Sequence, residues 1–470
     1  MAAETSAEVG ADRALMFPAG FMWGAATSAY QIEGSVAADG RGPSIWDTFS
    51  HAPGRIADGQ TGDVACDSYR RLDEDIQLLT QLGVGAYRFS IAWPRIQPTG
   101  AGPVNQAGLD HYRELVARLR ERGIMPVVTL YHWDLPQALQ DKGGWVARET
   151  AQRFADYAEM VARGLGDQVA MWITLNEPQV VVNVGHRWGR HAPGISDARQ
   201  ASAVTHHLLL GHGLAVDAIR AAAGPGAEVG ITLNLTSVRA AGPASVEAAR
   251  IIDSEVNGLF LEPVLLGRYP VQLPTEVRPS ADLIRDGDML QISRPIDFLG
   301  VNYYRPDLVR LEGGDGPRPG ETPLPGHPGI VAVHQTNVPI TEMGWPVDPE
   351  GLFELLTRLS RDFPNLPLYV TESGAAFADR VGPDGVVEDP ERVAYLQGHL
   401  AAAWRAIQAA VDLRGYFVWS LIDNFEWDQG YSKRFGLFYV DYQTQRRTPK
   451  GSALWFQEVA KGNRLPAGGD

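Results

Sequence analysis

Residues 171–178 read MWITLNEP, an apolar run that ends in two polar residues, Asn176 and Glu177. The run is almost continuously hydrophobic, which is the pattern of a parallel strand that is buried on both faces. Segments of the same form recur along the chain, at residues 21–26, 86–91, 125–130, 228–233, 296–301, 368–371 and 415–419. We therefore expect a sheet of eight buried parallel strands.

Helical patterns lie between these strands, at residues 67–82, 109–122, 150–165, 201–223, 349–361 and 389–410. The first two patterns end at Gly83 and Gly123, and glycine is the residue that most often follows a helix C-terminus. Alternation of strand and helix predicts the α/β class and a single-domain (β/α)8 TIM barrel, with long loops at the C-terminal face of the strands.

The same pattern gives expected domain limits: an N-terminal extension at residues 1–16, the barrel at 17–464 and a C-terminal tail at 465–470. Residues 312–329 are crowded with glycine and proline and predict a long loop after the sixth strand.

Composition excludes several classes of function. The chain has 470 residues, a hydrophobic fraction of 44% and a formal charge of −15. This acidic balance argues against nucleic acid or an anionic membrane as a partner. The sequence shows neither a secretory signal nor an apolar stretch long enough to span a bilayer. Its single cysteine, Cys66, excludes an intramolecular disulfide and fits a reducing compartment, so we expect a cytoplasmic protein.

Polar and aromatic residues follow the expected strands at the end where a TIM barrel carries its active site. Trp residues beside carboxylates and amides suit sugar rings, which have apolar C–H faces and hydroxyl edges. The residues at these strand ends are Gln31, Arg88, His132, Trp133, Asn176, Glu177, Asn302, Tyr304, Glu372, Trp419, Glu426 and Trp427.

Two of these residues, Glu177 and Glu372, end the fourth and seventh expected strands and so face each other across the barrel mouth. Paired carboxyl groups are the minimal equipment for glycoside hydrolysis, with one group protonated and the other ionised. A separation of about 5–5.5 Å would indicate a retaining enzyme and a wider gap an inverting one. Spacing alone leaves open that either glutamate forms a structural ion pair with an arginine such as Arg88.

Five motifs in order resemble glycoside hydrolase family 1, the β-glucosidase family. They are FMWGAATSAYQIEG (residues 21–34), YHWDLP (131–136), TLNEP (174–178), VTESG (370–374) and DNFEW (423–427). The similarity extends from about residue 17 to 458. It implies that Glu177 is the acid/base and Glu372 the nucleophile of a retaining β-glycosidase.

The resemblance also implies roles for the surrounding residues. Gln31, His132, Asn176, Glu426 and Trp427 would bind the sugar hydroxyls, and Trp133 would join them through its indole N–H. Trp419 would lie beneath the ring, Trp345 would line the leaving-group subsite, and Phe435 would also belong to the substrate-binding set. Tyr304 and Arg88 would hold Glu372 ionised, with Asn302 beside them. The family usually has Asn after the nucleophile, where this chain has Ser373, so we expect a modest change in the Glu372 loop.

The implied reaction is hydrolysis of terminal non-reducing β-D-glucosyl residues from aryl glucosides and short oligosaccharides such as cellobiose, through a covalent glycosyl-enzyme. It needs neither a metal nor an organic cofactor, and its partner is a small glucoside. The resemblance also implies that β-galactosides and β-fucosides are accepted, because Gln31 and Glu426 can each contact neighbouring hydroxyls.

Three other functions fit these residues less well. A 6-phospho-β-glycosidase would carry Ser at Glu426 and Tyr at Phe435, and an ionised Glu426 would repel the phosphate despite Lys433. A catalytically inactive sugar-binding barrel would generally lack one of the glutamates. A metal-dependent hydrolase would need a cluster of His and Asp at the strand ends. His206, His207 and His212 share one expected helix away from the barrel mouth, so we interpret them as structural.

Overall fold

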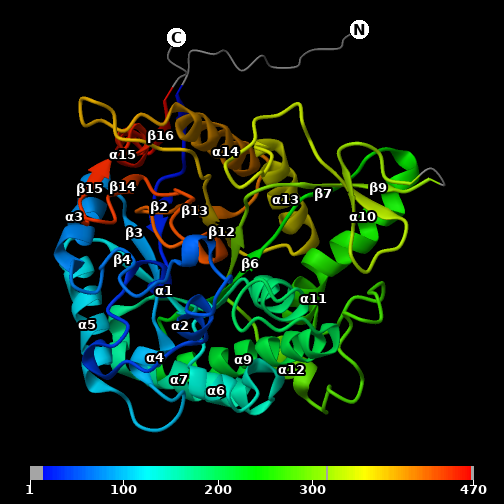
Figure 1. Ribbon diagram of the computed structural model, residues 1–470, viewed down its shortest axis with the longest axis horizontal. Coiled ribbons are helices and arrows are strands. Elements are labelled where there is room, and N and C mark those ends of the chain that lie inside the picture. The colour runs from blue at the N-terminus through cyan, green and yellow to red at the C-terminus, as the bar shows by residue number, and fades with distance from the viewer. Residues whose placement is uncertain (1–13, 314–315, 467–470) are drawn as a thin grey trace.

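The computed structural model describes residues 14–313 and 316–466 and contains a closed barrel of parallel strands (Figure 1). Each barrel strand pairs with its neighbours in parallel register. The (β/α)8 architecture predicted from the sequence is confirmed. The barrel strands are β2 (Met22–Ala26), β3 (Ala86–Ser90), β4 (Met125–Tyr131), β5 (Met171–Asn176), β6 (Glu228–Asn234), β8 (Phe298–Asn302), β12 (Leu368–Ser373) and β13 (Leu413–Trp419).

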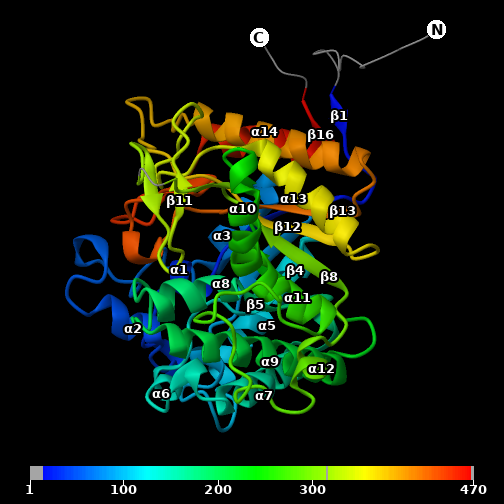
Figure 2. The same cartoon turned by 90° about the vertical axis from the view of Figure 1, so that its right-hand side faces the viewer.

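Helices cover the outside of the barrel. Figure 2 shows α13 and α14 along one side of the barrel, with α7 and α9 on the opposite side. The main helices are α3 (Leu72–Leu82), α5 (Gln106–Glu121), α7 (Glu149–Leu165), α9 (Ala198–Ala223), α10 (Val246–Asp253), α11 (Leu259–Leu266), α12 (Asp288–Ile292), α13 (Pro349–Asp362), α14 (Pro390–Gln408) and α15 (Gly451–Gly462).

The start of the first predicted helix was wrong. The sequence predicts a helix from residue 67, but α3 begins at Leu72 and the preceding residues form turns. Asp67 has φ +52°, a left-handed conformation that no α-helix interior contains. Gly83 ends the helix with φ +71°, as predicted.

Large rings fill the barrel interior where the strands supply glycine. A Cβ atom on Gly24 would lie 2.3 Å from Cδ1 of Phe417, and one on Gly230 would lie 2.6 Å from Cε2 of Phe298. Both rings are buried and pack with Val127 and other inward-facing side chains. Because strand neighbours such as Ala25 and Ala26 are buried on opposite faces of the barrel wall, the strands read as continuous apolar runs.

A second, small sheet stands beside the barrel mouth, at the right of Figure 1. Its strands are β7 (Val238–Ala240), β9 (Asp307–Leu311), β10 (Glu321–Pro323) and β11 (Ile330–Val333), in the order β10-β11-β9-β7. The prediction of a loop over residues 312–329 is therefore wrong in part, because β10 lies within that stretch. Val309 and Ile330 pack against Ile252 of α10, and this burial stabilises strands that are too short to be evident in the sequence.

The two ends of the described chain lie side by side. β1 (Leu15–Met16) pairs with β16 (Arg464–Leu465), and the Leu465 side chain is buried. Most of the predicted N-terminal extension (1–13) and of the predicted tail (467–470) lies outside the described residues, so the expected domain limits stay a prediction. Within residues 14–313 and 316–466, we find no helix that is long and apolar enough to cross a membrane.

Candidate active site

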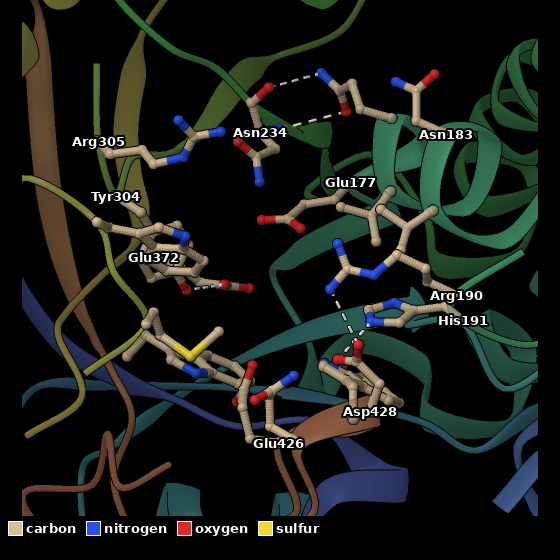
Figure 3. A pocket seen from close by; sticks show the side chains of 18 of the residues that line it. Glu177, Asn183, Arg190, His191, Asn234, Tyr304, Arg305, Glu372, Glu426 and Asp428 are labelled. Carbon is tan, nitrogen blue, oxygen red and sulfur yellow. Dashed lines mark hydrogen bonds and ion pairs between the residues drawn. The ribbon is translucent and has the colours of Figure 1, made fainter. Parts of the chain in front are cut away.

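A pocket of about 540 Å³ opens at the C-terminal ends of the barrel strands. Glu177 follows β5 directly, and Glu372 lies in β12 in register with Asn302 of β8. Figure 3 shows the carboxyl groups of Glu177, Glu372 and Glu426 converging on the same space. The barrel thus brings together three carboxyl groups that are far apart in the sequence.

Glu372 is held by a donor on each oxygen. Arg88 Nη1 donates to Oε1 at 2.6 Å, and the Tyr304 hydroxyl donates to Oε2 at 2.6 Å. Burial and the charge of Glu372 raise the pKa of Tyr304 well above its usual range, so the phenol stays a donor. A cation and a neutral donor on one carboxylate stabilise its ionised form, which is what a nucleophile requires.

Glu177 has the opposite environment. Burial raises its pKa to about 8, and the nearby charge of Glu372 acts in the same direction. Asn302 Nδ2 donates to Oε1 at 2.7 Å, which opposes both effects. The carboxyl group is therefore mostly protonated at neutral pH, as a general acid must be.

The backbone at three pocket residues is unusual. Glu177, Trp133 and Trp427 have φ values of +47°, +80° and +49°. Such conformations are uncommon for residues other than glycine, and they concentrate at functional sites where the surrounding structure compensates for the strain. Nothing in the sequence pattern indicates them.

His132, Trp419 and Trp427 form one wall of the pocket. The His132 ring stacks near Trp419 with 5.8 Å between centroids and near Trp427 with 6.0 Å. Burial and then the charge of Arg88 hold the pKa of His132 well below its usual range, so the ring is neutral. Asn176 Nδ2 lies 3.0 Å from His132 Nε2, while Nδ1 has no partner among the described residues. Nδ1 is therefore a free polar atom at a pocket residue.

Several predicted site residues lie behind the pocket surface rather than on it. The predicted residues that line the pocket are His132, Trp133, Glu177, Tyr304, Trp345, Glu372, Trp419, Glu426, Trp427 and Phe435. Arg88, Asn302, Asn176 and Gln31 are buried beneath them. Asn176 Oδ1 accepts from Arg88 Nη2 at 2.6 Å and from Asn302 Nδ2 at 3.1 Å, so it connects the surroundings of both glutamates.

Two predicted roles change with this geometry. The indole N–H of Trp133 donates to the Asn176 carbonyl at 2.9 Å, so Trp133 presents its ring rather than a free donor. Gln31 Nε2 donates to Asn424 Oδ1 and the Phe425 carbonyl, each at 3.0 Å, and lies 3.4 Å from Glu426 Oε2. In the free protein Gln31 thus supports the loop that carries Glu426.

The protonation state predicted for Glu426 was wrong. Burial and the neighbouring charge of Asp428 raise the pKa of Glu426 to about 8. Asp428 itself is ion-paired with His191 and Arg190, as Figure 3 shows. Although burial raises the pKa of Asp428, its contacts with His191 and Arg190 hold it below its usual value. Glu426 is therefore largely neutral at pH 7, because burial and the surrounding carboxylates disfavour its charged form.

Ser373 faces away from the pocket. Its hydroxyl lies 3.2 Å from the Tyr395 hydroxyl on α14, and the side chain is fully buried. The predicted structural histidines also lie outside the pocket lining. His206 contacts Asp288 at 2.9 Å, His207 contacts the Trp145 carbonyl and His212 contacts Thr174.

The outer part of the pocket was not predicted beyond Trp345. It is lined by Gln179, Asn183, Val184, Trp188, Asn234, Thr236, Val256, Arg305, Met343 and Lys433. These residues lie mostly in loops and short helices beyond the barrel strands, where periodicity carries no information. Asp428 could have been suspected from its position two residues after Glu426.

Comparison with known proteins agrees with this geometry. Residues 14–465 match the model of the family described as Glycosyl hydrolase family 1. A thermostable beta-glucosidase B of Thermobispora bispora is 52% identical, with coverage of 97% of this chain and 92% of the relative. A bifunctional beta-D-glucosidase/beta-D-fucosidase of Bifidobacterium breve is 49% identical, with coverage of 94% and 98%. The structure of a Thermotoga maritima beta-glucosidase in complex with noeuromycin superposes with a TM-score of 0.89 at 47% identity and covers 96% of this chain and 99% of that one.

Proposed function

The chain belongs to glycosyl hydrolase family 1, and on this premise we propose that Glu372 is the nucleophile and Glu177 the acid/base of a retaining β-glucosidase. The protein hydrolyses terminal non-reducing β-D-glucosyl residues of small glucosides. The observation that carries the assignment is the contrast between the two carboxyl groups. Glu372 accepts from Arg88 and Tyr304, whereas burial raises the pKa of Glu177 to about 8.

In the first step Glu372 attacks the anomeric carbon and the bond to the leaving oxygen breaks. Glu177 gives its proton to that oxygen, so the leaving group departs as a neutral alcohol or sugar. The product is a covalent glycosyl ester of Glu372 in which the negative charge of the carboxylate has disappeared.

In the second step water replaces the ester. The charge of Glu372 is one cause of the raised pKa of Glu177, so the pKa of Glu177 falls once the ester has formed. Glu177 is then ionised and takes a proton from the attacking water, while the ester bond breaks and Glu372 returns to a carboxylate. The same residue thus serves as acid and base because its neighbour changes charge.

Around the reacting centre, Trp419 supplies an apolar face and His132 and Glu426 supply polar groups. The position of His132 in the pocket lining supports a role in binding the sugar. Trp345 lies 5.4 Å from Tyr304 between ring centroids, which supports its place beside the leaving group. Acceptance of β-fucosides is supported by the activity named for the relative from Bifidobacterium breve.

The assignment is tested by trapping the ester. A 2-deoxy-2-fluoro-β-glucoside with an activated leaving group should form a long-lived adduct, because fluorine destabilises the positively charged transition state. Digestion and mass spectrometry should locate one added sugar on the peptide that contains Glu372, and Glu372→Gln should not be labelled. A label on another residue would exclude Glu372 as the nucleophile.

A cytoplasmic location is also part of the proposal. Its support is chemical, because the chain has a single cysteine and forms no intramolecular disulfide. Fractionation of the source cells with an antibody to the protein tests this point.

A further inference from the structure

The leaving-group side of the pocket is bounded by a wall of two π-helical segments. Glu177 must lie beside the leaving oxygen that it protonates. The residues that follow Glu177 in the chain therefore lie on the leaving-group side of the pocket. They form η5 (Val181–Arg187), which contributes Asn183 and Val184 to the pocket. Figure 3 shows Asn183 in the outer region beyond Glu177. The second segment, η7 (Ser254–Gly258), contributes Val256.

Behind this wall lies a buried cluster of three charged or titratable side chains. Arg187 ends η5, Glu255 lies in η7, and His327 lies in the turn between β10 and β11. Arg187 Nη1 lies 2.5 Å from Glu255 Oε1, and His327 Nε2 lies 2.7 Å from Glu255 Oε2. The three side chains are 9%, 8% and 7% exposed. One carboxylate therefore connects three separate segments of the chain.

The turn that carries His327 is packed closely against the same arginine. Gly326 has φ +80°, and a Cβ atom at this position would lie 2.7 Å from Nη2 of Arg187. Backbone hydrogen bonds from His327 to Leu324 and from Ile330 to His327 close the turn. The hairpin of β10 and β11 is thereby fixed to the back of η5.

Hydrogen bonds also connect the wall to Thr236, the polar residue beside it. Asn257 of η7 accepts from the Thr236 N–H at 3.1 Å and donates to the Thr236 carbonyl at 2.9 Å. Thr236 lines the pocket. A displacement of η7 would therefore move Val256 and Thr236 together.

We propose that the Arg187–Glu255–His327 cluster positions the leaving-group wall and so sets the preference for leaving groups that extend beyond one sugar ring. The inference rests on the proposed function, because it needs Glu177 to be the acid/base. Burial raises the pKa of Glu255, but His327 and Arg187 outweigh this effect and the pKa lies below its usual value. Removal of the Glu255 charge would take from Arg187 the buried carboxylate that lies 2.5 Å from its Nη1, and we expect the wall to move in response.

The chain offers a matched control for this cluster. Asp288 also joins an arginine and a histidine, with Arg148 Nη1 at 2.8 Å and His206 Nε2 at 2.9 Å, and its side chain is 6% exposed. None of these three residues lines the catalytic pocket. Glu255→Gln and Asp288→Asn therefore remove the same kind of charge, one beside the pocket wall and one far from it.

The experiment compares three substrates with the same glucosyl group: 4-nitrophenyl β-glucoside, cellobiose and cellotriose. In Glu255→Gln we expect kcat/KM for cellotriose to fall about 10-fold or more, mainly through KM, because small misplacements of a binding wall have large effects. The value for 4-nitrophenyl β-glucoside and the inhibition constant of deoxynojirimycin, which fills only the glycone site, should change by no more than about twofold. Asp288→Asn should leave the ratios between the substrates unchanged even if it lowers Tm.

Substitutions at His327 separate positioning from a general loss of structure. His327→Gln keeps a polar side chain near the place of Nε2 and should behave as wild type. His327→Leu replaces the ring contact to Glu255 with an apolar side chain and should reproduce the Glu255→Gln pattern. Equal losses on all three substrates, or an unchanged cellotriose ratio in both Glu255→Gln and His327→Leu, would overturn the inference. Absence of glucosidase activity in the wild-type protein would instead refute the proposed function.

Discussion

Glu177 and Glu372 carry the same functional group, but their hydrogen-bond partners differ. Arg88 and Tyr304 satisfy both oxygens of Glu372. Glu177 instead accepts from neutral amide side chains, of which Asn302 Nδ2 lies 2.7 Å from its Oε1. Asn176 accepts hydrogen bonds from both Arg88 and Asn302. It therefore fixes the surroundings of Glu372 and those of Glu177 relative to each other. The two roles thus depend on residues that do not line the pocket.

The role of Glu177 predicts how substitution will depend on the leaving group. Glu177→Gln should slow hydrolysis of alkyl glucosides and cellobiose by about 10² to 10⁴, the usual contribution of a general acid. Activated aryl glucosides need less protonation, so their glycosylation step should suffer less, and added azide should yield a β-glycosyl azide. Steady-state kinetics over a series of leaving groups measures this, with exposed Glu350→Gln as the control. Equal losses for every leaving group would remove Glu177 from the role.

The raised pKa of Glu426 predicts a pH-dependent discrimination against 6-phosphoglucosides. Glu426 ionises with a pKa of about 8, whereas a phosphate monoester is already a dianion above about pH 6 to 7. Repulsion should therefore grow between pH 7 and 9, and the kcat/KM ratio of glucoside to 6-phosphoglucoside should rise. Titration of Glu177 affects both substrates and largely cancels in the ratio.

Two variants test the source of this effect. Asp428→Asn removes a charge that raises the pKa of Glu426, so the rise in the ratio should move to lower pH. Glu426→Ser should abolish the rise and lower kcat/KM for the neutral glucoside. The exposed Asp167→Asn should behave as wild type. A ratio that is independent of pH in the wild-type protein would show that Glu426 does not face the 6-position.

At the residue scale, the sequence could identify functional groups but not their hydrogen-bond partners. The motifs located Glu177 and Glu372, and the barrel topology placed them at one rim. The indole N–H of Trp133 was assigned to the sugar, yet it donates to the Asn176 carbonyl. The charge of Glu426 was also misjudged, because it depends on burial and on Asp428 rather than on the residue type.

At the scale of elements, the buried strands were predictable and the small sheet was not. A strand of the barrel is apolar on both faces, so its run of residues stands out, and the predicted starts and ends agree with the structure to within a few residues. β10 contains only Glu321–Pro323 and is largely exposed, so no periodicity reveals it. Its position depends on pairing with β11 and on contacts between distant residues such as His327 and Glu255.

A buried lysine joins the loops that follow the last two barrel strands. Lys450 Nζ lies 2.5 Å from Asp379 Oδ2 and 2.6 Å from Asp423 Oδ1, and the lysine side chain is 0% exposed. Lys450 immediately precedes α15, while Asp423 begins the loop that carries Glu426. The lysine therefore connects an outer helix to the binding loop.

Lys450→Met should destabilise the fold strongly, because two carboxylates would lose a shared buried cation. We expect a loss of about 3–5 kcal/mol in the free energy of unfolding, the usual effect of removing one partner of a buried ion pair. The midpoint of guanidinium unfolding measures this. Lys142→Met, at an exposed position, should change stability by no more than about 0.5 kcal/mol. Arg392 also contacts Asp379 at 2.7 Å, and Arg434 contacts Asp423 at 2.6 Å. A similarly small change for Lys450→Met would show that these two arginines suffice to stabilise the aspartates.

At the scale of the whole molecule, the active site reduces stability. Burial raises the pKa of Glu177 and Glu426 to about 8, and it also raises the pKa of Asp134, outside the pocket lining, to about 8. In the unfolded chain these groups have ordinary pKa values near 4. The folded state therefore binds more protons than the unfolded state between about pH 4 and pH 8, and stability falls as pH rises through this window.

Neutral isosteres should remove this loss. Glu177→Gln and Glu426→Gln should each raise the free energy of unfolding at pH 8, on the order of 4 kcal/mol, because the unfolded wild-type chain gains stability by ionising a carboxyl group that the fold keeps protonated. At pH 4 both variants should differ little from wild type, since the carboxyl groups are then protonated in both states. Asp134→Asn should show the same pH dependence, which would assign the effect to burial and not to catalysis. Denaturant unfolding at pH 4, 6 and 8 measures how the free energy of unfolding changes with pH. Variants that are equally destabilised at every pH would refute the idea that keeping these buried carboxyl groups protonated reduces the stability of the fold.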